Sequence, residues 1–292
     1  LITGATGFLG SHLLQVLLKE KLEIIVLKRS FSNTWRIQSL LNKVNCYNID
    51  QIPLEKIIQE QHIDIIIHTA TNYGRGQVNY KSIIDDNILY PIRILESSLN
   101  FYPNICFINT DTFFSKPQFF YAYLPHYTLS KAQFLSWLKL FSEQASIVNM
   151  RLEHVYGPAD SHDKFVPRLI SNLQNNTQSL DLTNGEQKRD FIFVEDVVHA
   201  FLLVLKNDSL KNIGFKEYEV GTGTAISVKK FITKMKRFTS STTTLNFGKL
   251  PQRENEIMHS QANNRSLIEI GWKPQYSMEQ GIQKTLAISQ SI

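Results

Sequence analysis

The chain has 292 residues, of which 42% are hydrophobic and 20% are charged. These proportions are typical of a globular protein, and the length allows one large domain or a domain with an added lobe. The net charge of +5 is modest and the basic residues are scattered along the sequence, so we expect no nucleic acid partner. No apolar run approaches the ~18 residues that span a bilayer, and we expect no membrane partner and a cytoplasmic location.

Cysteine and histidine usage argues against a disulfide and against a metal. Cys46 and Cys106 both lie in apolar, strand-like runs, which predicts core thiols in a reducing compartment. The eight histidines show neither HxxxH nor HxH spacing, and no CxxC pair accompanies them. We therefore predict no metal site.

A short apolar run, a glycine-rich turn and an amphipathic stretch open the sequence. Gly4, Gly7 and Gly10 are three residues apart, and the apolar residues that follow recur at helical spacing. A strand, a turn and a helix in this order present backbone N–H groups and a positive helix end to a pyrophosphate. The turn therefore predicts a dinucleotide site formed by Gly4, Thr6, Gly7, Phe8, Leu9 and Gly10. Because the first strand is truncated at Leu1, we expect a few residues to precede it.

Apolar runs then alternate with helical patterns through the first half of the chain. Strands are predicted at residues 24–27, 44–47, 64–68, 105–109 and 147–151. Helices are predicted at residues 11–19, 35–41, 54–61, 83–99 and 127–143. This alternation predicts an α/β fold with a Rossmann-type, doubly wound parallel sheet, whose ligands bind at the carboxyl ends of the strands.

The alternation becomes irregular after Gly157 and Pro158. Helical patterns cover residues 165–174, 195–205, 228–236 and 278–287, and short apolar runs predict strands at 191–194, 217–220 and 243–247. We therefore expect a dinucleotide-binding domain over residues 1–156. Residues 157–292 should form a smaller, mainly substrate-binding lobe that closes over the carboxyl edge of the sheet.

The residues that follow the second predicted strand favour NADP(H) as the cofactor. An acidic residue there would bind the ribose 2′-hydroxyl of NAD. This chain instead has Lys28, Arg29 and Ser30, and a guanidinium suits a 2′-phosphate by its charge and its paired donors. A solvent-exposed Lys–Arg pair is the alternative. The other expected cofactor contacts are Asp50, Thr69, Ala70 and Thr71. Asp50 would accept a hydrogen bond from the adenine amino group. The other three are small residues at a place where the backbone passes close to the cofactor.

A tyrosine and a lysine four residues apart begin the helix before the strand at 147–151. Tyr127 and Lys131 share one helix face, so the ammonium can lower the pKa of the phenol and bind the nicotinamide ribose. Of the eleven tyrosines, Tyr127 alone has a lysine at the fourth position. Thr110 follows the strand at 105–109, so its hydroxyl either donates to a substrate oxygen or caps a turn. We predict these three residues to be catalytic.

In chain order, these features resemble the extended short-chain dehydrogenase/reductase family, in its nucleotide-sugar branch. The likeness spans nearly the whole chain and includes Asn87 and the segments 151–158, 189–196 and 253–256. The resemblance implies that Asn87 belongs to the cofactor site. It also implies that Arg189 and Arg253 bind the diphosphate of a nucleotide-sugar substrate, and that the protein is a homodimer through the helices at 83–99 and 127–143.

Within this branch the chain is most similar to reductases that make CDP-activated 3,6-dideoxyhexoses. The resemblance implies reduction by NADPH of the 4-keto group of CDP-4-dehydro-3,6-dideoxy-D-glucose, on the way to the O-antigen of lipopolysaccharide. The configuration produced at C4 stays open, and so does the nucleotide base when it is judged from chemistry alone.

Two stretches depart from the family pattern. His154 stands where relatives usually have asparagine, and we expect it to contact the sugar diphosphate. The segment between Thr110 and Tyr127 is short and aromatic. Its aromatic residues either line a pocket for a deoxygenated sugar or pack in the core; they are Phe113, Phe114, Phe119, Phe120, Tyr121 and Tyr123.

Two other functions remain open. An epimerase or a 4,6-dehydratase would retain NAD on the same fold. The dehydratase uses an Asp-Glu pair after the threonine, whereas here Asp111 is followed by Thr112, and the acidic ribose contact favoured by the epimerase is missing. A non-enzymatic dinucleotide sensor typically lacks the tyrosine–lysine pair. The sequence therefore favours a nucleotide-sugar 4-ketoreductase.

Overall fold

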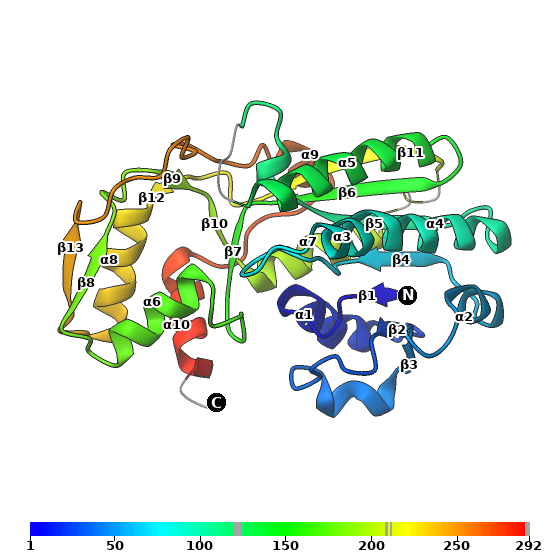
Figure 1. The fold of residues 1–292 in the computed structure, drawn as a ribbon, viewed down its shortest axis with the longest axis horizontal. Helices are drawn as coiled ribbons and strands as arrows, with labels where there is room; N and C mark the ends of the chain where they lie inside the picture. Colours follow the sequence, from blue (N-terminus) through cyan, green and yellow to red (C-terminus); the bar gives the residue numbers. More distant parts are fainter. Residues whose placement is uncertain (120–123, 208–209, 211, 290–292) are drawn as a thin grey trace. The chain divides into compact units, whose positions relative to one another are not determined.

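A computed structural model describes residues 1–119, 124–207, 210 and 212–289 (Figure 1). The chain divides into two compact units. The first unit comprises Leu1–Pro117, Tyr123–Arg151 and Val198–Tyr218, and the second comprises Gln118–Ala122, Leu152–Val197 and Glu219–Ile292. We expected a single boundary after residue 156. The first unit also contains residues 198–218, because they supply most of a helix and an edge strand to its sheet.

The first unit is built on a seven-stranded sheet in the order β11-β6-β5-β4-β1-β2-β3. Its strands are β1 (Ile2–Thr3), β2 (Ile25–Lys28), β3 (Asn45–Asn48), β4 (Ile65–His68), β5 (Cys106–Thr112), β6 (Ser146–Leu152) and β11 (Gly214–Val220). The pairs β1–β2, β1–β4, β2–β3 and β4–β5 are parallel. The predicted doubly wound parallel sheet is confirmed. Its strand order reverses between β1 and β4, the point where this architecture binds ligands.

Apolar side chains cover both faces of this sheet. On one face, residues such as Leu27, Ile66 and Phe107 pack into a continuous core with Ile57 and Phe134 of the helices. Their neighbours along the strands are equally buried on the opposite face, since side chains alternate; examples are Val26, Ile67 and Ile108. Strands buried on both faces explain the uninterrupted apolar runs in the sequence.

The helices of the first unit follow the predicted order. They are α1 (Phe8–Leu17), η1 (Leu18–Glu20), η2 (Gln38–Lys43), α2 (Leu54–Glu60), α3 (Tyr80–Ile84), η3 (Asp85–Leu89), α4 (Tyr90–Phe101), η4 (Phe113–Ser115), α5 (Pro125–Phe141) and most of α7 (Val194–Leu205). The helix expected at 35–41 is instead a 3₁₀ helix, η2, none of whose residues is buried, so no apolar face stabilises an α-helix there. The helix expected at 83–99 contains the π-helical turn η3 just before Pro91, which cannot donate a backbone hydrogen bond.

The second unit contains short strand pairs and helices (Figure 1). Its pairs are β7 (His154–Tyr156) with β10 (Phe191–Phe193), β8 (Ser179–Leu182) with β13 (Thr244–Phe247), and β9 (Lys188–Arg189) with β12 (Ile226–Ser227). Its helices are α6 (Phe165–Gln174), α8 (Val228–Thr239), α9 (Arg265–Glu269) and α10 (Met278–Ser289). Strands as short as β9 and β12 leave no periodicity in a sequence, and we did not predict them.

One predicted strand changes its partner. We assigned residues 217–220 to the C-terminal lobe, but they belong to β11, which extends the main sheet beside β6. The ion pair between Arg151 of β6 and Glu217 of β11, at 2.7 Å, joins the two strands through their side chains. Such a long-range pairing leaves no local signal in the sequence.

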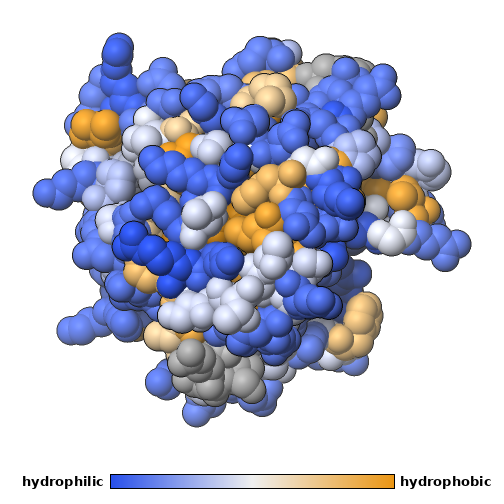
Figure 2. Space-filling view, turned by 90° about the vertical axis from the view of Figure 1, so that its left-hand side faces the viewer, coloured by the Kyte–Doolittle hydropathy of each residue, from blue (hydrophilic) through white to orange (hydrophobic). Residues whose placement is uncertain are grey.

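Helix α8 shows how the second unit divides polar from apolar surface. It buries Phe231, Ile232 and Met235, and the ring of Phe231 stacks on Phe191 with 3.9 Å between centroids. Lys229 and Lys230 are exposed on the same helix. The corresponding side of the molecule is largely hydrophilic, with a small apolar group near its centre (Figure 2).

Across the described part of the chain, no helix combines the length and the apolar character needed to cross a membrane. Cys46 and Cys106 are both free thiols. Among the same described residues, no group of three or more histidine, cysteine, aspartate or glutamate side chains is arranged to hold a metal ion.

Candidate active site

The glycine turn after β1 brings the start of α1 against the end of β4. Gly4 has a φ of +70°, and a Cβ there would lie 2.5 Å from the backbone nitrogen of Ala70. A Cβ on Gly10 would lie 2.2 Å from the carbonyl oxygen of Gly4. Both positions therefore require glycine. A Cβ on Gly7 would meet the Gly4 oxygen at 3.1 Å and no other atom within 4 Å, so the outer side of the turn is open. The residues fit a pyrophosphate at the N-terminus of α1.

Threonines hold the carboxyl ends of β1 and β4 together. The hydroxyl of Thr69 donates to the carbonyl of Thr3 at 2.8 Å, and the Thr3 hydroxyl lies 2.8 Å from Nδ1 of His68. The backbone N–H of Ala70 points to the Thr3 hydroxyl at 3.4 Å. Burial, and then the charge of Lys131, lower the pKa of His68 to about 3, so it is neutral. These bonds fix the backbone at the point where the strand order reverses.

The end of β2 carries the side chains predicted to select NADP. Lys28 donates to Asn48 Oδ1 at 2.6 Å, so its ammonium is held against β3. Ser30 donates to the carboxylate of Asp50 through its backbone at 2.7 Å and its hydroxyl at 2.5 Å, and these bonds lower the pKa of Asp50. Asp50, which we expected to meet the adenine, thus orders the loop after β2. Arg29 keeps half of its side chain exposed.

A loose ion pair and a second guanidinium accompany Arg29. Its guanidinium lies 3.6 Å from the carboxylate of Asp86. Arg36 donates to the carbonyl of Thr6 in the glycine turn at 3.3 Å and lies over the ring of Trp35 at 4.4 Å. Arg36 was not predicted from the sequence, because residues 35–41 were assigned to a helix and the prediction of cofactor contacts rested on the residues next to the strand. Arg36 is a further candidate for the cofactor phosphates.

Asn87 links the loop after β4 to helix α5. Its Oδ1 accepts from the backbone of Asn72 at 2.7 Å and the hydroxyl of Thr71 at 3.3 Å. Its Nδ2 donates to the carbonyl of Asn72 at 2.8 Å and to the hydroxyl of Ser130 at 2.9 Å. The resemblance implied a cofactor contact, whereas these four bonds engage the whole amide within the protein. The cofactor contact of Asn87 therefore stays a prediction.

Helix α5 places Tyr127 and Lys131 beside the end of β5, both of them buried. The ammonium of Lys131 donates to the backbone carbonyl of Thr110 at 2.6 Å. The hydroxyl of Thr110 is itself buried and has no hydrogen-bond partner among the described residues. A buried hydroxyl without a hydrogen-bond partner lowers the stability of the fold unless a ligand oxygen bonds to it. The three predicted catalytic residues are therefore together in one place.

The surroundings of Tyr127 favour the protonated phenol. Burial raises the pKa of Tyr127 well above its usual value, and Tyr73 and Asp111 raise it further. A hydrogen bond from Thr112 and the charge of Arg75 act in the opposite direction. Burial also lowers the pKa of Lys131. The ammonium of Lys131 donates to the carbonyl of Thr110, and the acidifying effect of Lys131 on Tyr127 stays a prediction.

An aromatic ring from the loop after β4 packs against Tyr127. The ring of Tyr73, in the loop after β4, lies 4.8 Å from the ring of Tyr127 with 38° between their planes. The guanidinium of Arg75 lies 5.2 Å from the centroid of Tyr73. Neither residue was predicted from the sequence, because a loop side chain is aimed by the backbone turn and not by a periodic pattern.

The opposite face of β5 is occupied by a buried ionic network. Asp111 accepts from the hydroxyl of Ser115 at 2.8 Å and from the amide of Asn149 at 3.0 Å, and lies 3.5 Å from Nε of Arg151. Arg151 in turn pairs with Glu217 at 2.7 Å. These contacts hold the carboxylate of Asp111 in one orientation. The side chain of Asp111 is therefore held by partners within the first unit, on the face of β5 away from Tyr127.

In the second unit, Arg189 of β9 has protein partners for its guanidinium. It donates to the carbonyls of Lys188 and Ile257 and pairs with the carboxylate of Glu256, which follows Arg253 by three residues. Arg253 itself is exposed. Both groups of the Arg189–Glu256 pair are nearly buried, at 5% and 10% exposure. The two predicted diphosphate-binding arginines therefore differ, one being paired and buried and the other lying at the surface.

His154 begins β7 and packs edge-on against Phe191 with 5.6 Å between ring centroids. Burial lowers its pKa to about 3, and the charge of Arg189 acts in the same direction. The imidazole is therefore neutral and can form hydrogen bonds to a diphosphate without adding charge.

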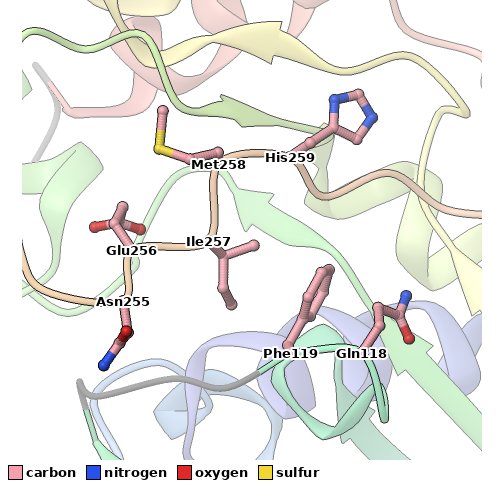
Figure 3. A pocket seen from close by; sticks show the side chains of 7 residues that line it. All are labelled: Gln118, Phe119, Asn255, Glu256, Ile257, Met258 and His259. Atoms are coloured by element: carbon pink, nitrogen blue, oxygen red, sulfur yellow. The ribbon is translucent and has the colours of Figure 1, made fainter.

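A cavity of about 330 Å³ adjoins the Arg189–Glu256 pair (Figure 3). It is lined by Gln118, Phe119, Asn255, Glu256, Ile257, Met258 and His259. The side chains of Phe119 and Ile257 face one another across it. Of the other aromatic residues in the segment before Tyr127, Phe113 and Phe114 pack on each other with 4.0 Å between their ring centroids. Phe120, Tyr121 and Tyr123 lie outside the described residues.

Comparisons with known proteins agree over nearly the whole chain. The model of the NAD dependent epimerase/dehydratase family matches residues 1–221. CDP-abequose synthases from Salmonella muenchen and Salmonella typhimurium are 38% and 37% identical over 99% and 98% of this chain and 97% and 96% of their own. The structure of UDP-glucuronic acid 4-epimerase from Bacillus cereus, in complex with UDP-glucuronic acid and NAD, has a TM-score of 0.84 and 23% identity, covering 99% of this chain and 98% of its own. That last likeness shows the fold.

Acid should destabilise the protein through its two buried neutral histidines. The pKa values of His68 and His154 are about 3 in the folded chain against 6.5 for the free side chain, so the unfolded state binds protons first. Stability is then complete above pH ~6.5 and is lost as the pH falls toward ~3. Between pH ~7.5 and ~5, each histidine should remove about 2 kcal/mol of unfolding free energy.

Urea unfolding at these two pH values measures the effect. His154→Asn should lose about 2 kcal/mol less than the wild type over this interval. His62→Asn, at a side chain that is 80% exposed, serves as the control and should leave the pH dependence unchanged. An acid sensitivity in His154→Asn equal to that of the wild type would show that His154 is not buried in the neutral form.

Proposed function

Since the chain belongs to the NAD dependent epimerase/dehydratase family, we propose that it catalyses the reaction of a CDP-abequose synthase. The protein would use NADPH to reduce the 4-keto group of CDP-4-dehydro-3,6-dideoxy-D-glucose, giving a 3,6-dideoxyhexose donor for O-antigen synthesis. The observation that carries this proposal is the 38% identity to a CDP-abequose synthase over 99% of the chain. The catalytic group formed by Thr110, Tyr127 and Lys131 supports it.

The mechanism assigns a separate task to each of these side chains. The hydroxyls of Thr110 and Tyr127 hydrogen-bond the ketone oxygen at C4 and polarise the carbonyl. NADPH, when bound, supplies a hydride for the carbonyl carbon. Tyr127 donates its proton to the oxygen, which becomes the C4 hydroxyl, and the charge remains on the phenolate. Lys131 binds the carbonyl of Thr110 at 2.6 Å, which holds α5 against the end of β5, and would also bind the nicotinamide ribose.

The state of Asp111 favours reduction over dehydration. A dehydratase needs a carboxyl group to move a proton at the sugar. Asp111 is bound to Asn149 and Arg151 on the far face of β5, and the next residue is Thr112. The tyrosine and threonine hydroxyls remain to act at the carbonyl, as a reductase requires.

Arg29 is the residue that we propose to recognise the 2′-phosphate of NADPH. Its guanidinium is half-exposed and lies 3.6 Å from the carboxylate of Asp86, so this ion pair is loose. A phosphate could form a shorter, charge-assisted hydrogen bond to the same guanidinium. Lys28 and Ser30 are held by Asn48 and Asp50, so they order the loop from which Arg29 projects. The glycine turn would bind the pyrophosphate, together with Arg36.

The second unit would bind the nucleotide diphosphate. Arg189 and Arg253 supply two guanidinium groups, and His154 supplies neutral hydrogen-bonding nitrogens. Because Arg189 is paired with Glu256, the substrate would compete with that carboxylate for one side of the guanidinium. The adjoining cavity, with Phe119 and Ile257 on its walls, would receive part of the nucleotide sugar.

A homodimer is proposed through the exposed apolar side of α5. Leu129, Trp137 and Leu140 are 57%, 47% and 61% exposed and lie along one side of the helix. Helix α5 packs against α3 and η3, where Ile84 and Leu89 are also about half-exposed. Exposed apolar residues that gather in this way are typical of a protein–protein interface.

The oligomeric state tests this interface. Light scattering should give twice the mass of the 33.7 kDa chain. Exchanging Trp137 and Leu140 together for glutamate should give the mass of one chain, because two charges would be buried without partners. Ile268→Glu, at an equally exposed residue of α9, should leave the dimer intact. A dimer that survives both glutamates would place the interface elsewhere.

The reaction itself is tested by mixing the protein with NADPH and a CDP-4-keto-3,6-dideoxyhexose. Absorbance of the reduced nicotinamide should fall in proportion to the sugar consumed, and NMR of the product should show the axial C4 hydroxyl of abequose. Tyr127→Phe should lower kcat by about 10²- to 10⁴-fold, because the proton donor is lost, while NADPH still binds. Tyr80→Phe, at a tyrosine that is 61% exposed, is the control.

Each other outcome of this assay identifies another function. An altered sugar without NADPH consumption would indicate an epimerase. An equatorial product would indicate a paratose-forming enzyme. Bound cofactor with no change in the sugar would indicate a sensor.

Cofactor choice is tested at Arg29. Arg29→Ala should raise the KM for NADPH by about 10-fold or more and leave the KM for NADH nearly unchanged, since NADH has no 2′-phosphate. Arg93→Ala removes a comparable exposed arginine, paired with Glu55 at 3.2 Å, and should change neither constant. An unaltered preference in Arg29→Ala would remove the argument for NADPH at this position.

A further inference from the structure

A carboxylate from the helical turn η3 lies beside the arginine that we propose to bind the 2′-phosphate. Oδ1 of Asp86 is 3.6 Å from Nη2 of Arg29, and the two side chains are 27% and 50% exposed. Both groups belong to the first unit and both can be reached from solvent. An anion that binds to Arg29 would therefore also meet a negative charge.

Hydrogen bonds hold the Asp86 carboxylate in place. Its Oδ2 accepts from Nδ2 of Asn72 at 2.9 Å and from the hydroxyl of Ser82 at 3.3 Å. The backbone of Asn72 is itself bound by the amide of Asn87, through its N–H at 2.7 Å and its carbonyl at 2.8 Å. Asp86 therefore cannot move away from Arg29 without breaking bonds that fix the loop after β4.

The two oxygens of Asp86 have different surroundings. Oδ2 carries both hydrogen bonds from the protein, whereas Oδ1 faces Arg29 at a distance beyond that of a hydrogen bond. Arg29 is oriented by its own loop, since its backbone N–H donates to the Ser32 hydroxyl at 3.1 Å and its guanidinium lies 5.6 Å from the centroid of Phe31. The two opposite charges are thus held separately, and Oδ1 keeps lone pairs for another donor.

The two nicotinamide coenzymes differ at one group, which is a 2′-phosphate in NADPH and a 2′-hydroxyl in NADH. A phosphate would be attracted by Arg29 and repelled by Asp86. A hydroxyl can instead donate to a carboxylate, as it does to the acidic residue that follows the second strand in NAD-binding relatives of this architecture. Here Arg29 follows that strand, and η3 brings a carboxylate to its side.

We propose that Asp86 is a specificity-determining residue of the cofactor site. Its carboxylate lowers the affinity for NADPH and raises the affinity for NADH, so the protein accepts both coenzymes. Arg29 and Asp86 together then set the preference, one favouring the phosphate and the other the hydroxyl. This inference rests on the proposed role of Arg29 and deepens it.

Equilibrium binding to the full-length protein tests the proposal without any sugar. The fluorescence of the reduced nicotinamide gives the Kd of each coenzyme. The wild type should bind NADH with a Kd within about 100-fold of that for NADPH. A wild type that binds NADPH but shows no measurable binding of NADH would overturn the proposal before any variant is made.

Asp86→Asn removes the charge and keeps the bond to Asn72. The amide oxygen can still accept from Asn72, which leaves the NH₂ group, a donor, beside Arg29. The Kd for NADPH should fall by about 3- to 10-fold because the repulsion is gone. The Kd for NADH should rise by about 3- to 10-fold because the acceptor is lost. Equal changes for the two coenzymes would overturn the proposal.

Two further variants separate the charge from a structural role. Ser82→Ala removes one hydrogen bond to Asp86 and keeps the carboxylate, so the ratio of the two Kd values should stay within about 3-fold of the wild type. Glu55→Gln is the matched control, since it removes the carboxylate of another arginine pair, with Arg93 at 3.2 Å, and should change neither Kd. A shift in Ser82→Ala as large as that in Asp86→Asn would assign the effect to bracing and overturn the proposal.

Salt dependence gives a readout that bracing would not move. The screening length falls from about 30 Å to about 3 Å between about 0.01 M and about 1 M salt. The advantage of Asp86→Asn over the wild type in binding NADPH should therefore shrink as salt is added. An advantage that is independent of salt would not arise from the charge of Asp86 and would overturn the proposal.

The outcomes keep this inference apart from the proposed function. If the wild type fails to reduce the CDP-ketosugar, the proposed reaction fails, while both Kd values can still be measured. If Arg29→Ala leaves the Kd for NADPH unchanged, the role of Arg29 fails and this inference fails with it. If Arg29→Ala weakens NADPH binding and Asp86→Asn changes neither Kd, the inference about Asp86 alone is wrong.

Discussion

The hydrogen bond from the Lys131 ammonium to the Thr110 carbonyl is the contact on which the candidate active site depends. A buried ammonium is costly unless strong acceptors surround it, so this bond at 2.6 Å fixes helix α5 against the end of β5. Tyr127, one turn earlier on the helix, is then held near the end of β5. Without this link, neither the proton donor nor its partners would have a defined position.

Several polar groups around the site have their hydrogen bonds satisfied within the protein. Asn87 makes four hydrogen bonds that tie the loop after β4 to α5. Asp111, Asn149, Arg151 and Glu217 form a buried network behind β5. Against this background, the hydroxyl of Thr110 lacks a partner among the described residues. A buried hydroxyl without a protein partner, held among fixed neighbours, can place a substrate oxygen precisely.

The diphosphate of the proposed substrate would compete with the carboxylate of Glu256 for the guanidinium of Arg189. The guanidinium of Arg189 is paired with Glu256, and the segment that carries Glu256 also carries Arg253 and lines a cavity. Binding an anion at Arg189 would therefore release a carboxylate from its partner. Part of the attraction between the arginine and the diphosphate would offset the loss of that pair.

The sequence determined the class of fold and named the candidate members of the site, because both depend on local patterns. The glycines three residues apart, the apolar runs and the Tyr127–Lys131 spacing each lie within a few residues of one another, and the structure and the family match confirm the doubly wound sheet and the resemblance to extended short-chain dehydrogenases. Tertiary structure alone decided which groups the site residues touch.

Particular residues separate what local sequence patterns determine from what the tertiary structure decides. The ammonium of Lys131 donates to the carbonyl of Thr110, the amide of Asn87 bonds the loop after β4 and Ser130 of α5, and residues 217–220 extend the main sheet. Each of these outcomes joins segments distant in the chain, where buried donors and acceptors compete for partners. That competition is settled by packing in three dimensions, and no spacing along the sequence records it.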